Sequence, residues 1–374
     1  MGLYIHIPFC AQKCPYCDFY SIPAAAAQMD AYCGALIDEI KTARRTSAFT
    51  QDGCKNRLVD TVYFGGGTPS VFGTERIAHV LQALREEYTL APNAEITVEC
   101  NPSCASAAFF EALAASGVNR VSLGLQSAID AERRALGRIA GADEARSAVL
   151  HARQAGITNI SLDLMLGIPR GNAATLRRSI DFSLSLGVPH ISAYMLKIEE
   201  DTPFAKTAPT LGLPDDDAVS DMYLFLCDYL NANGLPQYEI SNFAQPGFES
   251  RHNLKYWNCE EYLGLGPAAH SFVGNQRFFF ARDIAGFLEG SPSLFDSPGG
   301  SFSEYAMLRL RLAAGLSESE VQDRFHHSIP PAMRHNATIF AEHGMLIADE
   351  NGIRLTPQGF LLSNTIINTL LSQE

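Results

Sequence analysis

The chain has 374 residues, of which 47% are hydrophobic and 18% are charged. This composition can bury a large core, and the length predicts one large domain together with a smaller one. The formal net charge is −13 and no block of Lys or Arg counters it, which argues against a protein that binds nucleic acid or anionic lipid by charge.

The N-terminal residues do not have the pattern of a secretion signal, because no basic flank precedes a long apolar core. His6 also breaks the myristoylation pattern that Met1 and Gly2 would begin. No run of 18 or more apolar residues occurs, so we expect a cytoplasmic protein without a membrane-spanning segment. In that reducing compartment a cysteine cluster favours a metal site over disulfides.

Strand-like runs alternate with helix-like segments over the first 200 residues, and amphipathic helices are predicted over residues 29–45 and 75–88. Such β-α units predict a parallel sheet, which right-handed crossovers curl into a barrel. A full barrel of eight units needs about 250 residues, so we predict an α/β fold with a partial (β/α)6 barrel. The six runs begin at Leu3, Val59, Ala94, Asn119, Asn159 and His190.

The pattern changes twice after the sixth run, which predicts three regions. The barrel is expected over residues 1–205 and a central region over residues 206–298, entered through a loose segment around Pro203 to Pro214 and a helix over residues 218–231. The last region, residues 299–374, has helical segments followed by two short strands joined at Asn351-Gly352. These features predict an α+β C-terminal domain that resembles a winged helix and serves packing or a partner, not DNA.

Polar residues and glycines follow nearly every strand of the predicted barrel. Functional groups of a parallel barrel collect at the carboxyl ends of its strands, so we expect these residues to share one site. They are the cysteine loop after strand one, Gly65 to Pro69, Glu99 to Pro102, Gln126 with Ser127, Asp163 and Tyr194.

Cys10, Cys14 and Cys17 have the spacing C-x3-C-x2-C, and no fourth cysteine lies nearby. A zinc site would need a fourth ligand, for which His6 is the only close candidate. A [4Fe–4S] cluster held by three thiolates would instead keep one iron open to a small molecule. The other six cysteines, Cys33, Cys54, Cys100, Cys104, Cys227 and Cys259, are scattered, and we expect them to be small buried hydrophobes.

The cysteine spacing after the first strand, with Tyr16 before the third cysteine and Gly-Gly-Gly-Thr-Pro after the second strand, resembles the radical S-adenosylmethionine superfamily. The resemblance implies that the open iron binds S-adenosylmethionine and that the cluster supplies the electron that cleaves it. For Glu99, Asp163 and Arg138 a purely structural role stays open. The residues implied to bind S-adenosylmethionine are Tyr4, Tyr16, Gly66, Gly67, Thr68, Glu99, Gln126, Arg138 and Asp163.

A narrower resemblance runs the whole length, through IHIPFC, YFGGGTPS, E-x-N-P and LGLQS, to the oxygen-independent coproporphyrinogen III oxidase-like family. Its dehydrogenases carry a fourth cysteine where this chain has Phe19, whereas its HemW-type heme chaperones do not and carry an H-N-x-x-Y-W motif. This motif is present, and the resemblance implies that His252, Tyr256 and Trp257 bind heme. Histidine is a common axial ligand, and Tyr and Trp offer flat faces to the macrocycle. A structural role for His252 stays open, and His270 is a second candidate ligand.

Two functions follow from these resemblances. In the favoured one the protein is a heme chaperone that holds a [4Fe–4S] cluster, S-adenosylmethionine and heme, and delivers heme to apo-hemoproteins of the respiratory chain. The alternative is a coproporphyrinogen III dehydrogenase of porphyrin biosynthesis, which would need an electron acceptor, a pocket for four carboxylates and, by resemblance, an extension before the first strand. No catalytic residue is assigned. The resemblance leaves open a heme donor protein and a homodimer linked through the cluster.

Overall fold

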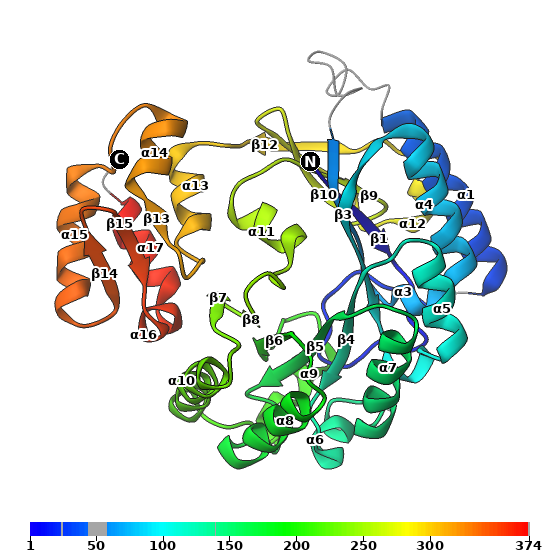
Figure 1. Ribbon diagram of the computed structural model, residues 1–374, viewed down its shortest axis with the longest axis horizontal. Coiled ribbons are helices and arrows are strands. Elements are labelled where there is room, and N and C mark those ends of the chain that lie inside the picture. Colours follow the sequence, from blue (N-terminus) through cyan, green and yellow to red (C-terminus); the bar gives the residue numbers. More distant parts are fainter. Residues whose placement is uncertain (24, 44–57, 139, 373–374) are drawn as a thin grey trace.

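The computed structural model describes residues 1–23, 25–43, 58–138 and 140–372. In this part of the chain six strands lie side by side in chain order, and every neighbouring pair is parallel. The predicted partial (β/α)6 barrel is therefore confirmed (Figure 1). The strands are β1 (Gly2–Ile7), β2 (Leu58–Gly66), β3 (Thr89–Cys100), β4 (Arg120–Gln126), β5 (Asn159–Leu166) and β6 (His190–Met195).

Helices between these strands cover the outer side of the sheet (Figure 1). Helix α1 buries Tyr32, Leu36 and Ile40 in one stripe, as the spacing of four residues requires. Helix α8 is capped by Asn172, whose side chain accepts hydrogen bonds from the backbone N–H groups of Ala174 and Thr175. The helices are α1 (Ala26–Ala43), α3 (Pro69–Phe72), α4 (Thr74–Glu87), α5 (Ala107–Ala115), α6 (Asp130–Ala135), α7 (Ala142–Gln154) and α8 (Ala173–Ser185), with the 3-10 turn η2 (Pro102–Cys104).

The central region extends both edges of the barrel sheet. β7 (Gln237–Glu239) and β8 (Asn242–Ala244) continue the sheet beyond β6, with β8 antiparallel to it. β9 (Tyr262–Leu265) pairs in parallel with β1, and β10 (His270–Val273), β11 (Gln276–Phe279) and β12 (Leu294–Pro298) follow in antiparallel order. The whole sheet therefore has twelve strands among the described residues.

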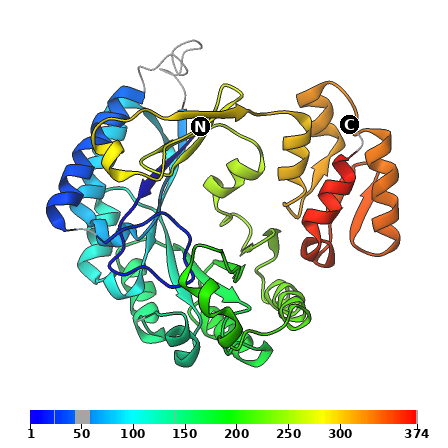
Figure 2. The same cartoon turned by 180° about the vertical axis from the view of Figure 1, so that it is seen from behind.

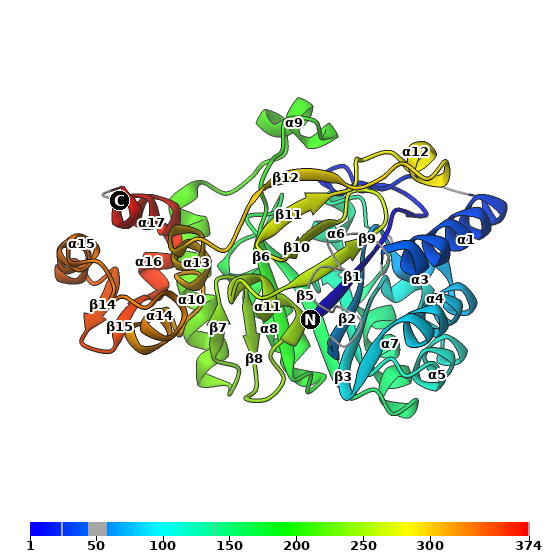
Figure 3. The same cartoon turned by 90° about the horizontal axis from the view of Figure 1, so that it is seen from above.

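Two features of this region differ from the sequence expectation. The segment expected to be irregular is built from strands of three to five residues, which are too short to show a clear alternation. The loose segment contains a short helix, α9 (Pro203–Thr207), and a 3-10 turn, η3 (Ala208–Thr210), which lie apart at one end of the barrel (Figure 3). The predicted helix is present as α10 (Asp216–Ala232), and α11 (Arg251–Trp257) and α12 (Ile284–Leu288) complete the region.

The C-terminal part contains helices around a three-stranded sheet of order β13-β15-β14. The hairpin predicted at Asn351-Gly352 joins β14 to β15. This part lies on the side of the molecule away from α1 and α4 (Figure 2). Its α+β character is confirmed. The domain boundaries at residues 205 and 298 stay predictions. Its elements are α13 (Phe302–Arg309), β13 (Leu316–Ser317), α14 (Glu318–Phe325), α15 (Pro331–Glu342), β14 (Leu346–Asp349), β15 (Gly352–Leu355), α16 (Pro357–Leu361) and α17 (Ser363–Leu371).

The scattered cysteines follow the expectation with one exception. Cys33, Cys100, Cys227 and Cys259 are buried, whereas Cys104 is exposed; Cys54 lies outside the described residues. In the described part of the chain, no helix has both the length and the apolar character that crossing a membrane would require.

Candidate functional site

The loop that carries Cys10, Cys14 and Cys17 leaves the carboxyl end of β1 and is fastened by backbone hydrogen bonds. The N–H of Cys10 donates to the carbonyl of Ile22 at 3.1 Å, and the N–H of Cys17 donates to the carbonyl of Cys14 at 3.1 Å. All three thiols are partly exposed. The loop therefore presents its cysteines at the barrel mouth from a fixed base.

The geometry does not favour the zinc alternative. The Nδ1 atom of His6 lies 3.2 Å from the Tyr4 hydroxyl, and its Nε2 atom lies 3.0 Å from the carbonyl oxygen of Tyr20. Since both ring nitrogens of His6 have partners, this histidine does not offer a fourth ligand here.

The segment at the end of β2 binds the backbone of the end of β1 and of the residues that lead into the cysteine loop. The N–H of Gly67 donates to the carbonyl of Ile7 at 2.8 Å, and the N–H of Thr68 donates to that of Phe9 at 2.7 Å. A Cβ on Gly67 would lie 2.7 Å from the carbonyl oxygen of Phe9, and Gly66 has a φ of +108°, so both positions require glycine. The result places the Thr68 hydroxyl 3.3 Å from the Cys10 thiol.

Glu99 lies beside the same glycines at the end of β3. Its carboxylate accepts a hydrogen bond from the Tyr63 hydroxyl at 2.8 Å and one from the N–H of Gly66 at 3.3 Å. Burial raises the pKa of Glu99 to about 7, although both hydrogen bonds oppose this shift. This carboxyl group can therefore exchange a proton near neutral pH.

Arg138 lies in the segment after α6, and Asp163 lies in β5. The Arg138 guanidinium donates to the carbonyl of Gly124 at 2.5 Å and lies 3.9 Å from the Cys14 thiol. Asp163 accepts a hydrogen bond from Ser122 at 2.8 Å, and burial raises its pKa against the opposing effect of hydrogen bonds and arginines. Gln126 ends β4 with a φ of +67°, an uncommon conformation for a residue other than glycine.

The two tyrosines of the predicted set lie at different depths. Tyr16 lies in the cysteine loop and packs against Phe204, with ring centroids 6.1 Å apart. Tyr4 lies inside β1, and its ring stacks on Tyr63 with centroids 6.2 Å apart. Of the nine residues predicted to bind S-adenosylmethionine, Tyr16 lies in the cysteine loop, and Thr68 and Arg138 lie beside its thiols. Tyr4 lies in the amino half of β1, and the others lie in or just after the carboxyl halves of β2 to β5.

The H-N-x-x-Y-W motif forms helix α11, and its histidine is held inside the protein. The His252 ring has Nδ1 2.8 Å from the Thr61 hydroxyl and Nε2 2.8 Å from the Tyr256 hydroxyl. Only 1% of His252 is exposed, and burial lowers its pKa to about 3, so its ring is neutral. Trp257 is half-buried beside Tyr256. In this arrangement neither nitrogen of His252 is available to a metal.

Comparison with known proteins gives concordant matches. Residues 4–183 match the Radical SAM superfamily, and residues 302–362 match the HemN C-terminal domain. The heme chaperone HemW of Mycobacterium tuberculosis (strain ATCC 25618 / H37Rv) is 35% identical over 99% of this chain and 94% of its own length. That of Bacillus subtilis (strain 168) is 33% identical over 99% of both chains. The chain belongs to the HemW family.

The fold of this HemW family member has a solved counterpart. The structure of coproporphyrinogen III oxidase (HemN) from Escherichia coli, described as a radical SAM enzyme, superimposes with a TM-score of 0.83. The match covers 100% of this chain and 90% of that one, at 22% identity, so it establishes the shared fold. The cofactors expected from the sequence, a [4Fe–4S] cluster and S-adenosylmethionine, are those of the radical SAM superfamily.

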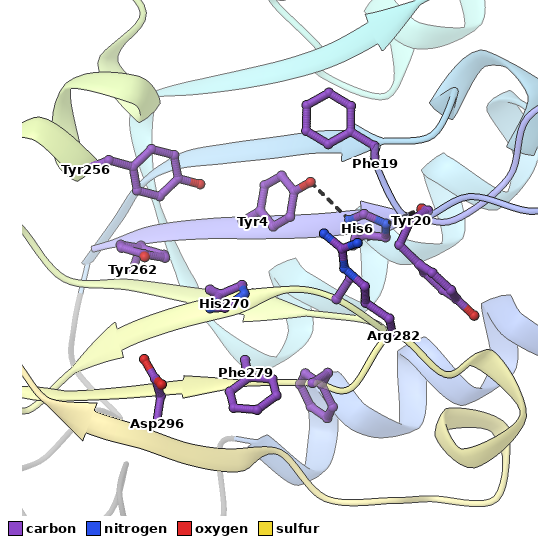
Figure 4. Close-up of a pocket in the computed structure, with 12 residues that line it drawn as sticks. Tyr4, His6, Phe19, Tyr20, Tyr256, Tyr262, His270, Phe279, Arg282 and Asp296 are labelled. Atoms are coloured by element: carbon purple, nitrogen blue, oxygen red, sulfur yellow. Dashed lines mark hydrogen bonds between the residues drawn. The ribbon is translucent and has the colours of Figure 1, made fainter. Parts of the chain in front are cut away.

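A feature that the sequence did not reveal adjoins the cysteine loop. A cavity of about 690 Å³ lies between the residues that follow Cys17 and strands β9 to β11 (Figure 4). Phe19, which stands where the related dehydrogenases have a fourth cysteine, lines this cavity. The preceding residue, Asp18, forms an ion pair with Arg282 of the cavity wall at 3.3 Å. The lining residues are Tyr4, His6, Phe19, Tyr20, Tyr256, Tyr262, Ala268, His270, Phe279, Phe280, Arg282 and Asp296.

Arg120 is a buried charged residue that the sequence did not single out. It begins β4 and is only 2% exposed, and the negative charges of Glu95 and Asp163 help to keep its guanidinium ionised. It is a single charged residue in an apolar strand, and a sequence pattern cannot show which carboxylates from other strands will face it.

Proposed function

We propose that this protein is a heme chaperone that holds a [4Fe–4S] cluster and S-adenosylmethionine at the barrel mouth and carries heme to apo-hemoproteins, including those of the respiratory chain. One observation carries the proposal: an aromatic cavity of ligand size adjoins the cysteine loop in a chain whose full-length relatives are heme chaperones. Its volume falls within the range of about 300–1,000 Å³ that is usual for ligand pockets.

Cys10, Cys14 and Cys17 would hold the cluster, and the residues beside them would hold S-adenosylmethionine. The contact between Thr68 and Cys10 supports this assignment, because it places the glycine segment against the first thiol. When bound, the two cofactors supply one-electron chemistry. The chain itself contributes thiolate ligands, backbone donors and the Glu99 carboxyl group, whose pKa of about 7 allows it to hold or release a proton.

The charges around the cavity favour heme over coproporphyrinogen III. A substrate with four carboxylates calls for several cations, because buried carboxylates need partners. In the described part of the chain, Arg282 is the sole Lys or Arg that lines the cavity, and Asp296 is acidic. Heme has two propionates, so one arginine and access to solvent are sufficient for it.

Helix α11 would contribute to heme binding through Tyr256, which lines the cavity. His252 lies behind Tyr256 and holds its hydroxyl group at 2.8 Å, which supports a positioning role for this histidine. Trp257, next along the helix, is proposed to pack near the same ligand.

We further propose a cytoplasmic location, a recipient hemoprotein, a heme donor protein and a homodimer linked through the cluster. The formal charge of −13 makes a nucleic-acid partner implausible. The dimer proposal predicts that the mass in solution, measured by light scattering, falls when the cluster is removed with a chelator.

The experiment that tests the function uses the full-length protein with its cluster reconstituted under anaerobic conditions. One sample receives hemin, and another receives coproporphyrinogen III with S-adenosylmethionine, a one-electron reductant for the cluster and an electron acceptor. A Soret band that survives desalting in the first, without protoporphyrinogen in the second, is the expected result; the reverse pair of results would show a dehydrogenase.

A matched pair of variants tests the cluster ligands. Cys17→Ser should lose most of the iron and sulfide after reconstitution, because it removes one of three thiolates. Cys104→Ser is the control, since this thiol is exposed and lies outside the cysteine loop. Equal iron and sulfide contents in the two variants would contradict the assignment.

A further inference from the structure

We propose that the heme occupies the cavity beside the cysteine loop, with His270 as its axial ligand and Arg282 as the partner of one propionate. This inference rests on the proposed function, because it assigns the site of the heme within it. It differs from the sequence expectation, in which His252 of the H-N-x-x-Y-W motif is the ligand. The histidines of this region differ in whether a ring nitrogen is free to bind iron in the cavity.

Three histidines lie on or directly behind the cavity wall, and two of them are engaged. His6 has partners at both ring nitrogens, Tyr4 and the carbonyl of Tyr20. His252 also has partners at both, and it is buried behind Tyr256. A histidine that binds iron must offer one nitrogen lone pair, so neither of these can act without losing an internal hydrogen bond.

His270 meets this requirement. It starts β10, is exposed and lines the cavity, and its ring has no hydrogen bond to another described residue. The ring stacks on Phe279 across the β10–β11 pair, with centroids 5.6 Å apart and an angle of 23° between the planes. Figure 4 shows it beside Phe279, with Tyr262 and Arg282 nearby. The stacking fixes the orientation of an otherwise free imidazole.

The charge state of His270 is suitable for ligation. Partial burial lowers its pKa, and Arg277 and Arg282 act in the same direction, while Asp296 opposes them. The ring is therefore neutral at pH 7, which is the form that binds iron.

The walls of the cavity match a porphyrin on both sides. Phe19 is 67% exposed, the largest exposed fraction among the large hydrophobic side chains described, and it faces the cavity from the cysteine loop. Phe279, Phe280 and Tyr262 line the opposite, strand side. A flat apolar ligand that covered the Phe19 ring would explain why this aromatic side chain is exposed to solvent beside the cavity.

Arg282 supplies the anchor for the edge of the macrocycle. Its guanidinium is 60% exposed and is held by Asp18 at 3.3 Å, so part of its donor set is free for a propionate. Because Asp18 follows Cys17 directly, the same ion pair couples the position of the heme anchor to the loop that carries the cluster ligands.

A single histidine ligand also fits the delivery of heme. No second histidine with a free nitrogen lines the cavity in the described residues, so no other histidine of the wall would compete for the iron. A ligand from the recipient protein would then have to displace a single histidine.

The test uses the full-length protein with its cluster reconstituted, titrated with hemin under anaerobic conditions. Binding is followed by quenching of Trp257, the only tryptophan of the chain, and heme spin state by optical and electron paramagnetic resonance spectra. The variants are His270→Ala, His270→Met, and His79→Ala as the control, because His79 is exposed on the outer helix α4. Iron and sulfide contents report whether each variant retains the folded cluster site.

We expect His270→Ala to weaken hemin binding by about tenfold or more, since even a residue that only supports a metal ligand is worth about 10–100-fold. Added imidazole should restore the wild-type spectrum, and His270→Met should shift it, effects that a structural histidine would not produce. Wild-type affinity and spectrum in both His270 variants would overturn the inference while leaving the proposed function intact. Failure of the wild-type protein to bind hemin would instead overturn the proposed function.

Discussion

Substitution of Gly67 by alanine should disrupt the cluster site without touching a cysteine. The added Cβ would lie 2.7 Å from the carbonyl oxygen of Phe9 and 2.8 Å from that of Ile7, and both atoms are backbone. A flexible side chain could move aside, but here the strand end and the start of the cysteine loop must shift. We therefore expect the glycine segment and the cysteine loop to separate.

The cost can be worked out from two contributions. Overpacking of a well-packed site costs about 1–3 kcal/mol. The hydrogen bonds from Gly67 to Ile7 and from Thr68 to Phe9 contribute about 1 kcal/mol each and would be weakened together. The expected loss is about 2–4 kcal/mol in the free energy of unfolding, a large fraction of the 5–15 kcal/mol that is typical of a folded domain.

Urea unfolding of the apoprotein measures this loss, and iron and sulfide analysis after reconstitution measures the consequence for the cluster. Gly34→Ala is the matched control, because Gly34 lies in helix α1 with open space around its Cα and should gain up to about 1 kcal/mol. Wild-type stability together with a full cluster in Gly67→Ala would refute the close-approach argument.

Three further predictions concern buried or exposed groups of the site. Burial raises the pKa of Glu99 from 4.5 to about 7, so the folded protein retains a proton that the unfolded chain releases, and stability falls as pH rises between these values. Glu99→Gln should reduce that slope in urea unfolding at several pH values; an unchanged slope would contradict the shift. His252→Ala should cost about 3 kcal/mol or more without heme, because it opens a cavity and leaves the Thr61 and Tyr256 hydroxyls unpaired; an unchanged unfolding midpoint would oppose this. Phe19→Ala should leave stability within about 0.5 kcal/mol, since the ring is exposed, yet weaken hemin binding about tenfold; equal affinity would show that Phe19 does not contact heme.

The barrel could be predicted from the sequence because each of its strands is long and is followed by a distinct helix. The six predicted starts lie within one residue of the observed strands except at Ala94, where β3 begins five residues earlier, at Thr89. The segment from Thr89 contains Pro92 and Asn93, which are residues typical of turns. They obscure the first part of β3, where Thr89 and Leu90 pair with the first residues of β2. Local composition therefore failed where tertiary pairing determined the structure.

The cavity could not be predicted in the same way. Its walls come from the cysteine loop, from Tyr256 on α11 and from strands β9 to β11, which are far apart in the sequence. The H-N-x-x-Y-W motif indicated a histidine with aromatic neighbours, and this is what the structure contains. A motif alone could not show that the nitrogens of His252 bind Thr61 and Tyr256, because Thr61 lies 191 positions away.

The placement of the central region has a consequence for how the chain can be divided. One stretch, residues 206–298, supplies the neighbour of β6 on one flank and the neighbour of β1 on the other. A fragment that stopped at residue 205 would present two rows of unsatisfied backbone amides and carbonyls to other molecules, an arrangement that invites aggregation. The polypeptide must therefore be synthesised well past its cofactor-binding half before that half can be shielded from self-association.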